Sequence, residues 1–283
     1  MPSARFTLSA FGDEIADDLA EQLQLLRDLG VGLDLRGAWG KNVLRFTDED
    51  VARVAQLCAD YGVTVHCIGS PIGKSPLKDP IQNELGNLER IVRIAEGVGT
   101  RRVRIFSFYP PDTHTNAHYD QHVEEAAERL SKLAAMAEQE DFMLLHENEK
   151  EIVGDTPERC AALLRAVDSP RLRLIWDPAN FVQVGVAEQV TRYWTLLGPY
   201  VAYIHIKDAL LADGSVRAAG EGDGQVKDLL IRLRDSGYQG ILSLEPHLAV
   251  AGPSGGFSGA EKMTYAVHAL RRLLDEIGAP AQP

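Results

Sequence analysis

The sequence predicts a single (β/α)8 barrel, and two observations carry this prediction. Eight short runs of large apolar and β-branched residues alternate with eight amphipathic stretches along the whole chain. No linker, low-complexity tract or break in composition divides the 283 residues. Chains of this length commonly form one such barrel rather than two small domains. We therefore expect one domain over residues 1–283, with a frayed Pro-rich tail at 279–283.

The expected elements follow one another in strict alternation. The apolar runs predict strands at Phe6–Ala10, Gly32–Arg36, Val63–Ile68, Arg102–Phe106, Phe142–Glu147, Leu172–Asp177, Ala202–Lys207 and Gly240–Glu245. Apolar residues at helical spacing predict helices at Ala16–Leu29, Asp48–Tyr61, Gln82–Val98, Asp120–Glu140, Thr156–Val167, Ala187–Leu197, Val226–Asp235 and Gly259–Ile277. Several of these helices are followed by a glycine, which suits a helix C-terminus.

A doubly wound parallel sheet is the alternative fold for such an alternating pattern. In that fold a G-x-G-x-x-G loop commonly follows the first strand, and ligand-binding residues gather around one switch point. No such glycine motif follows Phe6–Ala10 in this sequence, and the polar residues at the strand ends are spread along the chain. Both facts favour the barrel.

The composition is that of a globular enzyme with an acidic surface. Hydrophobic residues make up 45% of the chain, charged residues 25%, and the formal net charge is −12. An acidic surface disfavours nucleic acid as a partner, because binding to a phosphate backbone draws on basic patches. The three cysteines are odd in number and widely spaced, so no disulfide framework or cysteine zinc site is expected.

No segment of the sequence predicts membrane insertion or export. The first residues, MPSARFTLSAFGDE, lack a basic start followed by a long apolar core. No run approaches the roughly 18–20 apolar residues of a membrane span. We expect a cytoplasmic protein without a membrane partner, and the sequence leaves homo-oligomerisation open.

Four apolar runs in the second half of the chain each end at a metal-ligand type of residue: Glu147, Asp177, His205 and Glu245. In a barrel these would end strands five to eight, and the C-terminal ends of neighbouring strands converge on one mouth. Two glutamates, an aspartate and a histidine form an oxygen-rich set. Such a set suits Mn²⁺, Mg²⁺ or Fe²⁺ better than a structural zinc ion. The alternative is that each residue is an ordinary helix cap or loop contact.

Other polar residues near the strand ends are candidate substrate contacts: Arg36, Trp39, Ser70, Lys74, Lys150, Asn180, Lys207 and Arg217. Lys207 shares the strand parity of His205, so it can enter the mouth and neutralise an enolate oxygen or a phosphate. Arg217 stands in the glycine-rich segment VRAAGEGDG, which could bend over the mouth. The alternatives are solvated rim positions for the lysines, a mobile surface loop around Arg217 and a capping role for Asn180.

With these residues, the chain resembles the sugar phosphate isomerase/epimerase family of xylose isomerase-like TIM barrels. The series Glu147, Asp177, His205 and Glu245 matches that family's metal site in type, order and strand, and the likeness covers nearly the whole chain. The segments LRGAWGKN, IGSPIGK, ENEKEIVGD and DPAN also look like segments of one branch of the family. The resemblance implies one divalent metal ion, with Mn²⁺ the leading choice and Mg²⁺, Fe²⁺, Co²⁺ or Zn²⁺ as alternatives.

The resemblance also implies a reaction. In ketose 3-epimerases of this family the two metal-bound glutamates act as the acid and base, which would be Glu147 and Glu245 here. Proton transfer through a metal-stabilised enediolate would then isomerise or epimerise a sugar or sugar phosphate. One departure separates this chain from those epimerases: they have a histidine three residues after the ligand aspartate, where this chain has Asn180.

Three other functions stay open on the sequence. Expulsion of a β-substituent from the same enediolate would make the protein a lyase or dehydratase of a keto sugar or keto-inositol. A nuclease of the endonuclease IV type shares the barrel, but it needs additional histidines that the DPAN segment lacks. A metal-free sugar-binding barrel is the non-enzymatic alternative.

Overall fold

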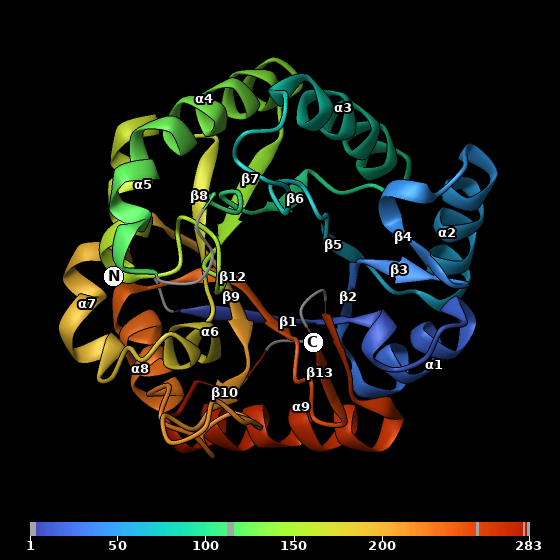
Figure 1. The fold of residues 1–283 in the computed structure, drawn as a ribbon. Coiled ribbons are helices and arrows are strands. Elements are labelled where there is room, and N and C mark those ends of the chain that lie inside the picture. The colour runs from blue at the N-terminus through green and yellow to red at the C-terminus, as the bar shows by residue number, and fades with distance from the viewer. Residues whose placement is uncertain (1–3, 112–115, 253–254, 280, 282–283) are drawn as a thin grey trace.

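The structure, a computed structural model, confirms the predicted (β/α)8 barrel. It describes residues 4–111, 116–252, 255–279 and 281. Eight parallel strands close in the order β1, β12, β9, β8, β7, β6, β5, β2, and the helices surround them (Figure 1). The strands are β1 Arg5–Phe11, β2 Gly32–Leu35, β5 Val65–Ile68, β6 Arg102–Ile105, β7 Met143–Glu147, β8 Leu172–Trp176, β9 Val201–Ile206 and β12 Gln239–Leu244.

Each predicted helix overlaps a helix of the structure. They are α1 Leu19–Leu29, α2 Asp48–Tyr61, α3 Ile81–Gly97, α4 Val123–Gln139, α5 Pro157–Val167, α7 Gln189–Leu197, α8 Val226–Ser236 and α9 Gly259–Glu276. The first helix starts later than predicted because the Asp18 side chain accepts hydrogen bonds from the backbone N–H groups of Ala20 and Glu21. One short helix, α6 Pro178–Gln183, is additional, and the side chain of Asp177 caps its N-terminus.

Alternating side chains on the strands separate two layers of the core. Leu144, Leu174, Ile204 and Leu242 face outward and join the large cluster between the strands and the helices. Residues adjacent to these in the strands face inward, and Cys67, Leu145, Ile175, Tyr203 and Ile241 form a second cluster inside the barrel. Since side chains alternate with a period of two, a ligand residue two or four positions further along the strand also faces inward.

A buried carboxylate ties four strands together inside the barrel. Asp34 is fully buried, and its oxygens accept hydrogen bonds from Ser9 Oγ (2.6 Å), Tyr203 Oη (2.7 and 2.8 Å) and Ser243 Oγ (2.8 Å). These donors come from β1, β9 and β12, while Asp34 lies on β2. The hydroxyl groups replace the water that the charged group loses on burial.

Three two-stranded hairpins lie in the segments that follow β2, β9 and β12. They are β3–β4 (Gly37–Ala38 with Lys41–Asn42), β10–β11 (Asp208–Ala209 with Val216–Arg217) and β13–β14 (Val250–Gly252 with Gly255–Phe257). At the C-terminus, Ala279 and Ala281 are partly buried against the core, while residues 280, 282 and 283 of the expected tail lie outside the described part. No helix within the described residues is long and apolar enough to span a bilayer.

The segment after β5 is fixed by a close approach of two backbones, which a substitution can test. Gly73 has φ +82°, and a Cβ atom there would lie 2.1 Å from the carbonyl oxygen of Phe106. Gly73→Ala should lower the free energy of unfolding by about 3 kcal/mol, through left-handed strain and overpacking together. Urea denaturation measures the change. Gly62→Ala is the control, because Gly62 has φ +68° with no atom within 4 Å of its added Cβ, so only the strain of about 1 kcal/mol should appear. Equal losses in the two variants would contradict this packing.

Candidate metal centre

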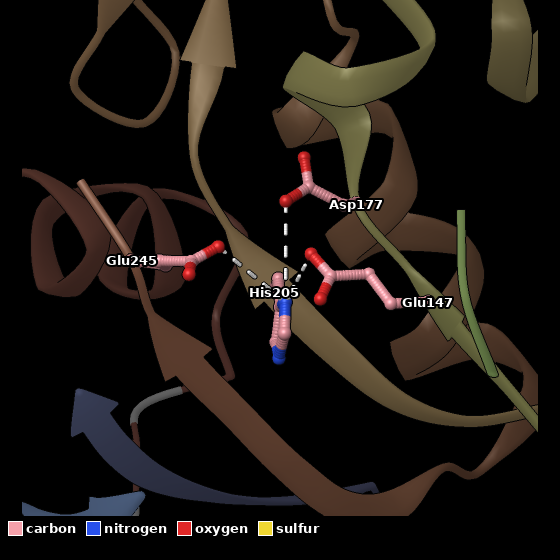
Figure 2. A group of neighbouring side chains, drawn as sticks. All are labelled: Glu147, Asp177, His205 and Glu245. Atoms are coloured by element: carbon pink, nitrogen blue, oxygen red, sulfur yellow. Dashed lines mark hydrogen bonds and ion pairs between the residues drawn. The ribbon is translucent and has the colours of Figure 1, made fainter. Parts of the chain in front are cut away.

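The four predicted ligand residues meet at the C-terminal mouth of the barrel. Glu147 is the last residue of β7, Asp177 follows β8, His205 lies in β9 and Glu245 follows β12. All four are buried, and each offers one ligand atom within 4.8 Å of the other three. Figure 2 shows the three carboxylates arranged around the His205 ring. Adjacent strands of one barrel therefore place four residues, far apart in sequence, around one point.

One atom of each side chain faces the common centre. His205 Nδ1 lies 2.9 Å from Glu147 Oε1, 3.8 Å from Glu245 Oε2 and 4.0 Å from Asp177 Oδ2. Ligands about 2.1 Å from one ion lie no more than about 4.2 Å apart, so small side-chain movements suffice to bind it. Asp177 Oδ2 is buried and accepts no well-directed hydrogen bond from the described residues, although Lys207 Nζ lies 3.0 Å away. The donor set and its geometry fit one divalent metal ion.

Three buried cations surround the carboxylates. Arg36 Nη1 lies 2.7 Å from Glu245 Oε1. Arg104 Nη1 lies 3.1 Å from Glu147 Oε2 and 3.5 Å from Glu245 Oε1. Lys207 Nζ lies 3.0 Å from Asp177 Oδ2 and 3.2 Å from Glu245 Oε2. Burying three carboxylates together would be very costly without such partners.

The cations oppose the effect of burial on the carboxyl groups. Burial raises the pKa of Glu147, but the charges of His205 and Arg104 outweigh it and bring the pKa to about 2. For Glu245, burial also raises the pKa, while Lys207, His247 and Arg36 hold it well below the usual value. Burial dominates at Asp177 and raises its pKa to about 6. At pH 7 all three groups are therefore ionised and can act as metal ligands.

Cations and aromatic rings alternate on the side of the mouth formed by β1, β2, β5 and β6. The Phe11 ring has the guanidinium groups of Arg36 and Arg104 at 4.7 and 5.0 Å from its centroid. The Phe106 ring has Arg104 at 4.9 Å and Lys74 Nζ at 4.4 Å. We call these five residues the cation–aromatic ladder. It positions the positive charges that compensate the carboxylates from the other half of the barrel.

Arg104 is a residue at this centre that the sequence prediction missed. It lies on β6, is 5% exposed, and donates through Nη2 to the carbonyl of Gly69 as well as binding the two glutamates. A signal for it exists in the segment RVRIF, since an arginine inside an apolar strand has to find a buried partner.

Three of the candidate substrate contacts bind the candidate ligand residues, and two of these, Arg36 and Lys207, do so through ion pairs. Asn180 Nδ2 donates to Glu147 Oε1 (3.2 Å) and to the carbonyl of Asn148 (2.8 Å). It therefore holds a ligand in place, while Asp177 provides the helix cap. Lys74 Nζ lies 3.3 Å from Glu149 Oε2.

The other four candidates make contacts away from the ligands. The Trp39 ring packs near Phe46 with Arg53 over its face. Ser70 Oγ donates to the carbonyl of Arg104, and Arg217 Nη1 donates to the carbonyl of Val216. Lys150 follows Glu149, whose side chain accepts from the Lys150 backbone N–H. Their roles as substrate contacts stay predictions.

The glycine-rich segment after β9 is fastened by one side chain. Asp208 is buried and accepts from the backbone N–H groups of Gly220 (3.1 Å), Gly222 (3.1 Å) and Gly224 (2.8 Å). An added Cβ at Gly222 would lie 2.4 Å from the carbonyl oxygen of Ala209. This close packing leaves no room for a side chain at Gly222.

A second polar group stands behind Glu245. Glu14 is buried, bonds to His247 Nδ1, and accepts from the His247 backbone N–H (3.0 Å) and from Ser258 Oγ (2.7 Å). His247 Nε2 lies 3.9 Å from Glu245 Oε1. Glu14 holds both the ring and the backbone N–H of His247. It therefore orients the His247 ring toward Glu245. The sequence prediction missed His247. The neighbouring Asp13 lies in the first turn of a short 3-10 helix, Gly12–Glu14, and binds Arg36 at 2.7 Å.

Comparison with known proteins agrees with this fold. The chain belongs to the xylose isomerase-like TIM barrel family, whose model matches residues 23–275. Among solved structures it is similar to a D-tagatose 3-epimerase-like protein (TM-score 0.74, 16% identity, covering 97% of this chain and 98% of that one). It is also similar to the probable 3-DHS dehydratase AsbF of Bacillus anthracis (0.71, 16%, 94% and 98%). A third similar structure is the IOLI protein with a bound zinc atom (0.72, 16%, 97% and 97%).

At such identities the similar structures establish the shared fold and no shared reaction. No curated protein sequence matches the chain. The similar structures include an epimerase-like protein and a probable dehydratase, and one barrel fold can support different reactions.

The histidine beside Glu147 predicts how stability changes with pH. His146 is 1% exposed, neither ring nitrogen has a partner among the described residues, and burial lowers its pKa to about 4. An unfolded histidine titrates near 6.5, so between these values only the unfolded chain binds the proton, and stability falls as the pH falls. From pH 7.5 to 5 this costs about 2 kcal/mol. His146→Leu should remove that loss in urea denaturation, while the control His268→Gln, at an exposed position, should keep it. A wild-type pH slope in His146→Leu would contradict the burial effect.

Proposed function

We propose that this protein is a divalent-metal-dependent isomerase or epimerase of a sugar or sugar phosphate. The observation that carries the proposal is the convergence of Glu147, Asp177, His205 and Glu245, whose ligand atoms lie within 4.8 Å of one another. Two carboxylates of this set, Glu147 and Glu245, lie on opposite sides of the His205 ring (Figure 2). A metal ion between two carboxylate bases suits proton transfer at a carbon next to a carbonyl group.

In this reaction the arginines, the two glutamates and Lys207 have separate roles. When bound, a divalent ion would polarise the carbonyl of a keto sugar and so acidify the neighbouring C–H group. Arg36 and Arg104 hold Glu245 Oε1 and Glu147 Oε2, which turns the other oxygen of each glutamate toward the centre. One glutamate takes the proton and the other returns it to the same or the adjacent carbon. Lys207, on the strand of His205 and beside the centre, stabilises negative charge that develops on a substrate oxygen.

A cavity next to the centre offers room for the remainder of the substrate. It has a volume of about 350 Å³, and its lining includes Asp13, Asp17, Arg36, Lys41, Asn42 and Phe257. This is within the usual range of small-molecule sites. Arg36 lines the cavity and also contacts Glu245, so this one side chain links a molecule bound there to the centre. Carboxylates, an amide and cations suit the hydroxyl or phosphate groups of a sugar.

Dehydration of a keto sugar or keto-cyclitol is the second candidate function. Asn180 favours it, because this chain has an amide bonded to Glu147 where ketose 3-epimerases have a histidine. The similar structure named as a probable 3-DHS dehydratase supports it as well. In this reaction the same base removes the proton, and the substrate then loses a β-hydroxyl group as water.

Metal analysis of the purified protein tests the centre. The wild-type protein, dialysed against Mn²⁺ and freed of excess, should retain about one ion per chain. Glu147→Gln and His205→Ala should each reduce the retained metal at least tenfold, because each removes a ligand. Glu149→Gln is the matched control on the same loop, since Glu149 pairs with Lys74 rather than with the centre. Unchanged metal content in Glu147→Gln and His205→Ala would refute the site.

Turnover in D₂O separates the two reactions. The Mn²⁺-loaded protein is incubated with a panel of ketoses, ketose phosphates, keto-cyclitols and 3-dehydroshikimate, and the products are followed by NMR and ultraviolet absorbance. An isomerase or epimerase should introduce one deuterium at the reacting carbon. A dehydratase should instead release water and produce an absorbing conjugated product. Formation of that product alone would overturn the isomerase assignment in favour of the second candidate.

A further inference from the structure

Lys207 contacts different carboxylate oxygens from those that Arg36 and Arg104 contact. Its Nζ lies 3.0 Å from Asp177 Oδ2 and 3.2 Å from Glu245 Oε2. These are the same two oxygens that face His205 Nδ1, at 4.0 and 3.8 Å. Lys207 is only 3% exposed, so water contributes little to balancing these charges. Its ammonium group therefore occupies the inner, metal-facing side of the carboxylates.

The arginines bind the outer side. Arg36 contacts Glu245 Oε1 at 2.7 Å, and Arg104 contacts Glu147 Oε2 at 3.1 Å. Neither of these oxygens is the one nearest His205 Nδ1. A metal ion can therefore bind the centre while both arginines keep their contacts. Lys207 cannot keep its contacts in that case, because they are made to the oxygens that the ion needs.

We propose that Lys207 is a placeholder counter-ion, which balances the metal-facing oxygens of Asp177 and Glu245 until a divalent ion displaces it. An ion bound about 2.1 Å from Asp177 Oδ2 would lie within about 5 Å of an ammonium group 3.0 Å from the same atom. Two cations at that distance repel each other, and both need the same oxygens. A lysine can yield because its charge sits on a flexible four-carbon stem, whereas a planar arginine is held by several hydrogen bonds.

The consequence is an internal competition that sets the metal affinity. Without a partner, the buried oxygens of Asp177 and Glu245 would destabilise the folded chain. Lys207 supplies that partner, and each metal-binding event has to break its two contacts. This inference rests on the proposed metal centre, and it adds a role for Lys207 before any substrate binds.

Two cation-deleting variants of the full chain test the competition. Lys207→Met and Arg104→Met each remove one buried positive charge from the same centre, but only the first frees metal-facing oxygens. Calorimetric titration with Co²⁺, supported by the visible absorption of bound Co²⁺, gives the dissociation constant. Lys207→Met should bind Co²⁺ at least tenfold more tightly than the wild type, and Arg104→Met should change the constant less than threefold. Equal tightening in both variants, or no tightening in Lys207→Met, would overturn the proposal.

Thermal unfolding provides an independent measure. In the presence of EDTA, Lys207→Met should have a lower Tm than the wild type, and saturating Co²⁺ should raise its Tm by more than it raises that of the wild type. Lys207→Gln, which keeps a hydrogen-bond donor without the charge, replaces the methionine variant if that variant does not fold. Equal Co²⁺-induced shifts in variant and wild type would contradict the competition. If the wild type itself binds no Co²⁺, the proposed metal centre fails together with it.

Discussion

The mutual repulsion of Glu147, Asp177 and Glu245 is the constraint on which the arrangement of this barrel mouth depends. Four neighbouring strands deliver these carboxylates and His205 to one point, where all of them are buried. Charges in such a place are tolerated only with close partners of opposite sign. Arg36, Arg104 and Lys207 supply three positive charges in direct contact with these carboxylates.

This constraint divides the barrel into two chemical halves. β7, β8, β9 and β12, with the residues that directly follow them, carry the candidate ligands. β1, β2, β5 and β6, with the segments that follow them, carry the cation–aromatic ladder. The rings of Phe11 and Phe106 separate the cations from one another, so three like charges can stand in a row. Deeper in the barrel, Asp34 is balanced by hydroxyl groups instead. The buried carboxylates Asp34, Glu147 and Glu245 are thus matched by groups from other strands.

The sequence predicts the fold and the ligands because both follow from local pattern. Apolar runs ending at Glu147, Asp177, His205 and Glu245 need only the alternation of strands and helices to become neighbours. The residues that prediction missed depend on contacts between distant segments. Arg104 meets Glu245 across 141 positions, and Glu14 meets His247 across 233. Nothing in the segment around either residue fixes such a distant partner. The short helix α6 was missed because its cap, Asp177, is also a ligand.

Anomalous X-ray diffraction from crystals grown with Mn²⁺ tests the metal centre most directly. We expect one strong anomalous peak bounded by Glu147, Asp177, His205 and Glu245, with ligand distances of about 2.2 Å and with His205 Nδ1 as the nitrogen ligand. We also expect that Arg36 and Arg104 still contact the outer oxygens of the two glutamates. A peak at any other place, or a mouth without a peak at saturating Mn²⁺, would contradict the proposed metal centre.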